Sequence, residues 1–230
     1  MSNPSEKMEV EFKSDCGRIL RTEALNIIDM ITITVGTGAE AVKFPVHEAV
    51  ARKSSAFLDN AMKPEWASPK ADPRDIQLVD EDPELFKVYL HWLYFKNMPT
   101  VYAGSKGKNY NHEYVLLCRC YIMGEKLMDV GFKNAMLDAL VGAMENTPRL
   151  VPGLTAINII YAGTLGGSPA RRFLVDIWVK MADESWLDYL TAALPHAFVL
   201  EFSRVLLQSR CKGKEDTRAW MERVKEYHEA

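Results

Sequence analysis

Hydrophobic and polar residues alternate along Ile31–Val35, where isoleucine and valine take turns with threonine. This alternation predicts a β-strand with one buried face. Gly36-Thr37-Gly38 supplies the backbone freedom of a tight turn, and the stretch 41–46 then predicts a second strand. Because Pro45 cannot donate a ladder hydrogen bond, we expect this strand to end there or to lie at a sheet edge. Its apolar side chains should share one face: Val42, Phe44 and Val46.

The spacing of hydrophobic positions then lengthens to that of helices, which predicts a change from strand to helix at Val46 and again after Leu78. Ser54 and Ser55 lie where a hydroxyl can cap a second helix, and Asp82-Pro83 is a typical helix start. We expect one core to contain Phe44, Phe57, Phe86 and Leu93. The predicted elements up to residue 145 are strands 31–35, 41–46 and 75–78 and helices near 47–52, 54–62, 83–95, 112–127 and 130–144.

Residues 63–74 contain three prolines, and this predicts a loop without a regular element. Trp66 lies in that loop, and an exposed indole is often a contact residue. The alternative is that Trp66 folds back on its own domain. Residues 17–30 precede the first strand and also leave two interpretations, a segment that covers the core or an arm that contributes to dimerisation.

The last third of the chain has helical spacing throughout. Gly163 and the pair Gly166-Gly167 should break one helix, after which Ser168 and Pro169 start another as N-cap and first residue. Leu194-Pro195 opens a third helix. In the segment 214–230 an otherwise charged sequence carries Trp220, Val224 and Tyr227 on one narrow stripe. We expect something to cover this stripe, either the chain's own helices or a partner.

The chain has 230 residues, 48% of them hydrophobic, which supports one well-packed domain with or without an extension. A net charge of -3 gives no electrostatic footprint for nucleic acid. No apolar run reaches the roughly 20 residues that a membrane span needs, and the polar N-terminus lacks the apolar centre of a secretion signal. We therefore expect a cytoplasmic or nuclear protein whose four cysteines are reduced thiols.

Four groups of residues could carry chemistry, and each has a simpler structural interpretation. Cys118 and Cys120 point about 200° apart on a helix, so they are expected as buried small hydrophobes, not metal ligands. His47 lacks a nucleophile and is expected as a hydrogen-bonded corner residue. Glu84 and the preceding acids Asp80, Glu81 and Asp82 suit a helix N-terminus. The stretch 163–172 could bind an anion, but a turn and a cap explain it better. No cofactor, metal or catalytic residue is predicted.

The N-terminal pattern resembles the BTB/POZ domain family: strand, Val-Gly turn, strand ending Phe-x-Val-His, short helix, Ser-x-Phe, helix. The residues that carry it are Val35, Gly36, Phe44, Val46, His47, Val50, Ser55 and Phe57. Asp82-Pro83-Glu84-Leu85-Phe86, followed by Leu93-Tyr94, is similar to the family's D-P-x-x-F and L-Y. Tyr121–Lys126 and Asp129–Asn134 resemble its later helices. Further matches resemble the C-terminal region of fungal BTB-domain proteins: Ile160-Tyr161 with Thr164, Arg172–Trp178 and Leu194–Phe198. With these matches the likeness covers roughly Asp29 to Leu207.

The resemblance implies an α+β protein, with a BTB/POZ fold at 29–145 between an N-terminal arm, 1–28, and a helical region, 146–230. It implies a non-enzymatic protein–protein interaction module that self-associates and acts as an adaptor or scaffold for an unidentified protein partner, without nucleic acid or membrane. The candidate interaction residues are Trp66, Tyr102 and Trp220.

Two alternatives remain. The first is a substrate adaptor of a cullin-based ubiquitin ligase. Such adaptors often carry an apolar-x-acid motif after the helix that ends here at Phe95, and Asn97–Tyr102 has no acid. The second, from a different class, is an enzyme with an unrecognised site. A deep polar pocket that gathers titratable residues would favour the enzyme, whereas an apolar patch would favour the interaction module.

Overall fold

The fold is α+β and is built on a small sheet whose central strand is β1 (Met30–Val35). β1 pairs antiparallel with β2 (Val42–His47) and parallel with β3 (Asp75–Leu78), which gives the order β2-β1-β3. Ile31, Ile33 and Val35 are all buried, which confirms the predicted alternation. The computed structural model describes residues 28–67, 72–101, 110–146, 150–183, 186 and 193–212.

β2 is an edge strand, as the proline predicted, but it does not end at Pro45. Pro45 lies opposite Thr32 and the strand continues to His47, since an edge strand needs hydrogen bonds on one side only. Phe44 and Val46 are buried as expected, whereas Val42, beside the turn, is exposed. Gly36 and Gly38 in this turn have φ angles of 85° and 61°, and a short 3-10 helix, η2 (Gly38–Glu40), follows.

Helices α1 (Glu48–Ser54) and α2 (Ala56–Ala61) follow directly, and Ser55 caps the second as predicted. Its hydroxyl accepts a hydrogen bond from the Leu58 amide at 3.0 Å and donates one to the Leu127 carbonyl at 2.5 Å. The expected loop at 63–74 is wrong in part, because α3 (Pro64–Ala67) is a short helix. Proline is tolerated in a first helical turn, where its missing N–H has no partner to lose.

α4 (Pro83–Phe95) begins at Asp82, whose carboxylate accepts a hydrogen bond from the Glu84 amide at 2.9 Å. α5 (Tyr110–Lys126) and α6 (Val130–Glu145) come next. The predicted core is confirmed, because Phe44, Phe86 and Leu93 are buried and Phe57 packs against the same cluster. The Phe44 and Phe86 rings lie 5.0 Å apart between centroids.

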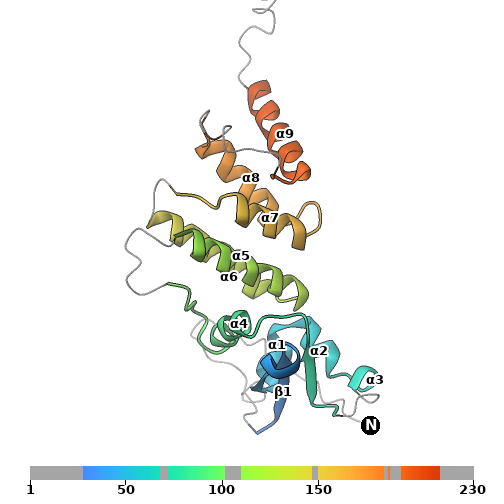
Figure 1. Ribbon diagram of the computed structural model, residues 1–230. Coiled ribbons are helices and arrows are strands. Elements are labelled where there is room, and N and C mark those ends of the chain that lie inside the picture. Colours follow the sequence, from blue (N-terminus) through green and yellow to red (C-terminus); the bar gives the residue numbers. More distant parts are fainter. Residues whose placement is uncertain are drawn as a thin grey trace, which may run out of the picture.

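The last third is helical, with α7 (Leu154–Gly163), α8 (Pro169–Met181) and α9 (His196–Lys212). Ser168 stands at the N-cap of α8 and Pro169 is its first residue, as expected, although the Ser168 side chain makes no capping hydrogen bond. Figure 1 shows the sheet at one end of an elongated stack, followed by α5 with α6, then α7 with α8, then α9. No helix within the described ranges is long and apolar enough to cross a membrane.

Candidate interaction surfaces

Trp66 lies on α3 and has 68% of its surface exposed. The alternative that it folds back on its own domain is therefore wrong, and Trp66 stays a candidate contact residue. The other two candidates, Tyr102 and Trp220, lie outside the described residues, as does the stripe predicted at 214–230.

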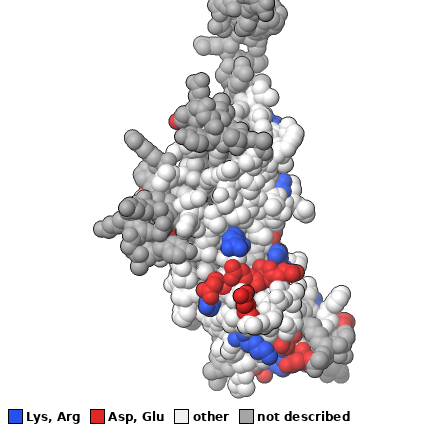
Figure 2. Space-filling view, viewed as in Figure 1, with Lys and Arg blue, Asp and Glu red and all other residues white. Residues whose placement is uncertain are grey.

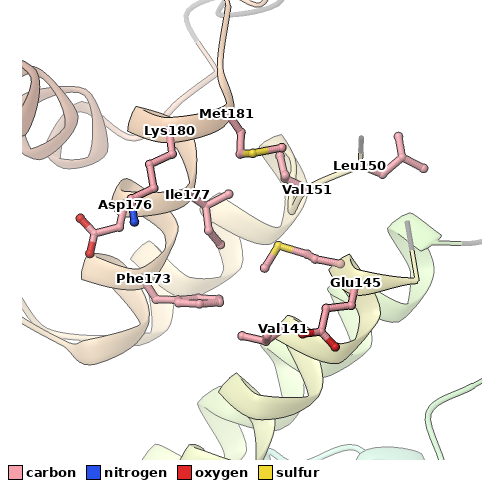
Figure 3. Close-up of a pocket in the computed structure, with 10 residues that line it drawn as sticks. Val141, Glu145, Leu150, Val151, Phe173, Asp176, Ile177, Lys180 and Met181 are labelled. Carbon is pink, nitrogen blue, oxygen red and sulfur yellow. The ribbon is translucent and has the colours of Figure 1, made fainter. Parts of the chain in front are cut away.

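An apolar groove lies between the C-terminal halves of α6 and α8 and has a volume of about 520 Å³. In Figure 3, Val141 of α6 faces Phe173 and Ile177 of α8 across the gap. Seven of the ten lining residues are apolar: Val141, Met144, Leu150, Val151, Phe173, Ile177 and Met181. We call this the α6–α8 groove.

α6 and α8 are each held in place by a face that is buried in the core, and this fixes the position of the groove between them. Leu140 and Ala143 of α6, and Leu174 and Trp178 of α8, are buried in the main core. Trp178 also donates a hydrogen bond from Nε1 to the Pro152 carbonyl at 3.1 Å, and this holds the segment 150–152 beside the groove. Apolar side chains next to these buried positions line the groove.

Charge is confined to three of the lining residues, Glu145, Asp176 and Lys180. Figure 3 shows Asp176 and Lys180 on the side of α8 away from α6. On the face in Figure 2, acidic side chains gather near the sheet-bearing end, whereas the surface over α7 and α8 carries few charges. An apolar floor with charge at its margin suits the apolar side chains of a protein segment.

Sequence patterns did not locate this groove. Two of its hydrophobic lining residues are partly exposed, Met181 by 45% and Val141 by 39%. The sequence of α6 did contain one signal of the groove. Val141 is hydrophobic, yet it lies outside the apolar stripe that Phe132, Met136 and Leu140 form on this helix. The partner face could not be found, because α6 and α8 meet only in the tertiary structure.

His47 has the structural role that its corner position predicted. Its Nδ1 lies 2.8 Å from the Tyr94 hydroxyl, and its backbone amide donates to the same oxygen at 3.0 Å. Cys118 and Cys120 are both fully buried, also as expected. Burial raises the pKa of each thiol to about 12, which keeps both uncharged at neutral pH.

The stretch 163–172 forms a turn, and one of its two arginines is used internally. Arg171 is buried and donates to the Thr164 hydroxyl at 2.9 Å and to the Tyr161 carbonyl at 2.8 Å. These contacts support the turn-and-cap interpretation over an anion site, because the guanidinium already ties α8 to the end of α7.

Acids at the start of α4 have partners as well. Glu81 pairs with Lys126 from α5, and Glu84 pairs with Lys87 one turn along α4. Within the part of the chain that the structure describes, no group of three or more histidine, cysteine or acidic side chains could hold a metal ion.

No protein-family model and no curated protein matches this chain.

Proposed function

We propose that this protein is a non-enzymatic protein–protein interaction module of the BTB/POZ type, which self-associates and acts as an adaptor or scaffold. The observation that carries this proposal is the α6–α8 groove, with its seven apolar lining residues. A groove of this composition offers surface for a partner's side chains but collects no nucleophile and general base for catalysis.

The arrangement of the N-terminal elements supports the BTB/POZ part of the proposal. Two strands, a run of short helices, a third strand and a long helix follow in the order that the resemblance implies. The residues that carried the resemblance also meet in space. His47 bonds to Tyr94 of the L-Y pair, and the ring of Phe44 packs against that of Phe86 in the D-P-x-x-F segment.

We propose that residues 17–30 form an arm that contributes to self-association. Of this segment, residues 28–30 are described, and Ile28 and Met30 have 84% and 37% of their surface exposed. A segment that only covers the core would bury such side chains, so the exposure favours the arm over the cover.

The groove is proposed to receive an apolar segment of the partner protein. Two variants test this, Val141→Glu and Met181→Glu, because both side chains are already partly exposed and a charge there should leave the fold intact. Leu165→Glu is the matched control, since Leu165 is 86% exposed and does not line the groove. Partners captured from the native cell should be compared between the three variants and the unmodified protein by quantitative mass spectrometry.

We expect at least one captured protein to be reduced about tenfold or more by both groove variants and to be unaffected by Leu165→Glu, because a buried unpaired carboxylate is costly at an apolar contact. Identical partner sets for all four proteins would reject the groove as a recruitment site.

Self-association is tested separately by sedimentation velocity on the full chain and on a chain that begins at residue 28. We expect the full chain to sediment as a dimer and the shortened chain to shift towards monomer. A full chain that remains monomeric at tens of micromolar would reject the self-association.

A further inference from the structure

α9 has two apolar faces, and the described residues cover one of them. On the inner face Phe198 lies against Trp178 and Tyr161, with ring centroids 5.4 Å and 5.5 Å apart. On the outer face four large aliphatic side chains are between 38% and 59% exposed: Val199, Leu200, Leu206 and Leu207. At 100° per residue these four fall within about one third of the helix circumference. We call them the outer stripe of α9.

The outer stripe is symmetric about Ser203, which is itself exposed. Val199 and Leu207 lie four residues before and four residues after this serine. Leu200 and Leu206 lie three residues before and three residues after it. The helix therefore presents the same pattern of aliphatic side chains when it is turned end for end. A two-fold contact between identical chains requires such a pattern, because each copy must offer the surface that it also receives.

The same spacing defines which side chains would meet in an antiparallel pair of α9 helices. Val199 and Leu206 share one flank of the stripe, and Leu200 and Leu207 share the other. With the two-fold axis beside Ser203, Val199 of one copy lies next to Leu206 of the other. Leu200 likewise lies next to Leu207. The two serines at the centre are small enough for the helix axes to approach to about 8–10 Å.

The charges around the stripe are compatible with a second copy. Between Val199 and Leu207 the charged residues are Glu201 and Arg204, and neither falls within the third of the circumference that the stripe occupies. Arg204 lines a hollow together with Asp176 and Glu201 of its own chain, and these acids offset its charge. An antiparallel pair also places the positive N-terminal end of each helix dipole beside the negative C-terminal end of the other.

The area of the stripe sets the strength of such a contact. One third of the circumference of a helix about 11 Å wide, over about 15 Å of its length, is on the order of 200 Å². Two copies would together bury about 400 Å² through the stripe, well below the roughly 1,200 Å² of a stable interface. We therefore expect a weak contact that forms at hundreds of micromolar protein.

We propose that the outer stripe of α9 is a self-association surface, on which α9 of a second copy docks antiparallel with the two-fold axis beside Ser203. Figure 1 shows α9 at the end of the stack opposite the sheet that Met30 begins. The contact is thus separate from the arm at 17–30 and does not depend on it. Where both contacts form, which rests on the proposed function, copies of the chain would join end to end.

Ser203→Cys in the full chain tests the contact, because a disulfide between two copies traps even a weak pair. A disulfide needs Cα atoms about 4.4–6.8 Å apart, a separation that facing residues at a two-fold axis can reach. Leu165→Cys is the matched control, since Leu165 is 86% exposed and lies outside α9. All chains also carry Cys16→Ser and Cys211→Ser. Covalent dimer is followed on non-reducing gels under a mild oxidant, at several hundred micromolar protein.

We expect Ser203→Cys to form covalent dimer at least about tenfold faster than Leu165→Cys. Adding Val199→Glu or Leu206→Lys should slow this reaction about tenfold, because each places an unpaired charge in the apolar contact. Both changes together should restore most of the rate, because the new carboxylate of one copy then meets the new ammonium of the other. Both side chains are partly exposed in the described fold, so circular dichroism should show unchanged unfolding.

Three results would overturn the proposal. Crosslinking of Ser203→Cys no faster than that of Leu165→Cys would reject a second copy and leave the stripe to a different protein. Fast crosslinking that neither single charge variant slows would place the contact away from the stripe. A double charge variant as slow as the single ones would reject the antiparallel arrangement, because a parallel pair sets like residues together. The covalent readout does not require residues 17–30, so failure of the arm and failure of this contact are separate results.

Discussion

At the scale of single residues, Asp129 holds more elements together than any local pattern indicates. The side chain is buried, and its Oδ2 accepts hydrogen bonds from the Ser54 hydroxyl at 2.6 Å and the Tyr89 hydroxyl at 3.0 Å. Its Oδ1 accepts one from the Phe132 amide at 2.9 Å and so caps α6. One carboxylate thus joins the end of α1, the middle of α4 and the start of α6. Burial and the neighbouring Asp129 charge raise the pKa of Tyr89, which keeps its hydroxyl a donor.

Asp129→Ala should therefore lower the free energy of unfolding by about 3–5 kcal/mol, since it removes three hydrogen bonds to a charged group and leaves the buried Tyr89 hydroxyl and the half-buried Ser54 hydroxyl without that acceptor. Urea unfolding followed by circular dichroism measures the change. Asp138→Ala is the control, because Asp138 is exposed on the same helix and should change stability by less than about 0.5 kcal/mol. Equal effects of the two substitutions would contradict the role assigned to Asp129.

The buried thiols give a second prediction at this scale. Burial raises the pKa of Cys118 and Cys120 from 9.0 to about 12, and only the thiolate is reactive. Iodoacetamide at pH 8 should therefore label neither cysteine in the folded protein and both in urea, as peptide mapping by mass spectrometry can show. Rapid labelling of either thiol without denaturant would contradict their burial.

The same pKa shifts predict how stability responds to alkaline pH. Because the folded pKa lies above the unfolded value, the thiols stabilise the fold fully below pH 9, and this contribution is lost as pH rises from 9 towards 12. The urea midpoint should fall over this range more steeply in the unmodified protein than in a Cys118→Ala/Cys120→Ala variant. Parallel pH profiles for the two proteins would reject the assignment.

The difference between Ser55 and Asp129 shows what a sequence discloses at residue scale. The Ser55 and Asp82 caps were predictable, because each bonds to an amide within three residues of itself. The Asp129 capping bond is equally local, but its bonds to Ser54 and Tyr89 cross 75 and 40 residues. Such partners are set by packing, and no local pattern reveals them.

At the scale of elements, a glycine at a helix end can be needed for close packing as well as for ending the helix. The sequence pattern indicated only the second of these roles. Gly163 is the last residue of α7, as expected, but it also lies against Ile122 of α5. A Cβ at this position would come within 2.6–2.8 Å of three Ile122 side-chain atoms. The short distance between α5 and α7 therefore depends on glycine.

Gly163→Ala should lower the free energy of unfolding by about 1–3 kcal/mol, because the added methyl forces α5 and α7 apart. Gly142→Ala is a matched substitution with the opposite expected sign. Gly142 lies inside α6, no heavy atom would lie within 4 Å of its new Cβ, and alanine should stabilise the helix by about 0.5–1 kcal/mol. Differential scanning calorimetry of both variants measures the contrast, and a stabilising Gly163→Ala would refute the close-packing argument.

Elements were predictable where one periodicity dominated and were missed where a short exception interrupted it. The strands around Ile33 and Ile76 and the long helices followed from the change of period. α3 was missed because its four residues are too few to show a helical period, and prolines around it indicated a loop. The α6–α8 groove was missed for a different reason, since it arises between two helices that are separated in sequence by a third.

At the scale of the whole molecule, the sheet-bearing part and the helical region share one hydrophobic core. The same cluster includes Ile33 of the sheet, Tyr121 of α5 and Phe198 of α9. α5 lies between the two parts, and its Tyr114 hydroxyl donates to the Leu150 carbonyl at 2.9 Å. The division expected at residue 145 thus separates segments of sequence, and the packing of the described residues continues across it.

This shared core predicts that residues 28–146 do not form a stable unit by themselves. Without α7 and α8, the face of α5 that holds Tyr121 and Ile122 would lose its cover, and a large apolar surface would face water. The full chain should unfold in a single transition, with the same urea midpoint by circular dichroism and by tryptophan fluorescence. A chain that ends at residue 146 should show no cooperative transition or should aggregate, whereas one that ends at Lys212 should keep its transition. Two separate transitions in the full chain, or a well-folded chain ending at residue 146, would show that the two regions are independent domains despite their common core.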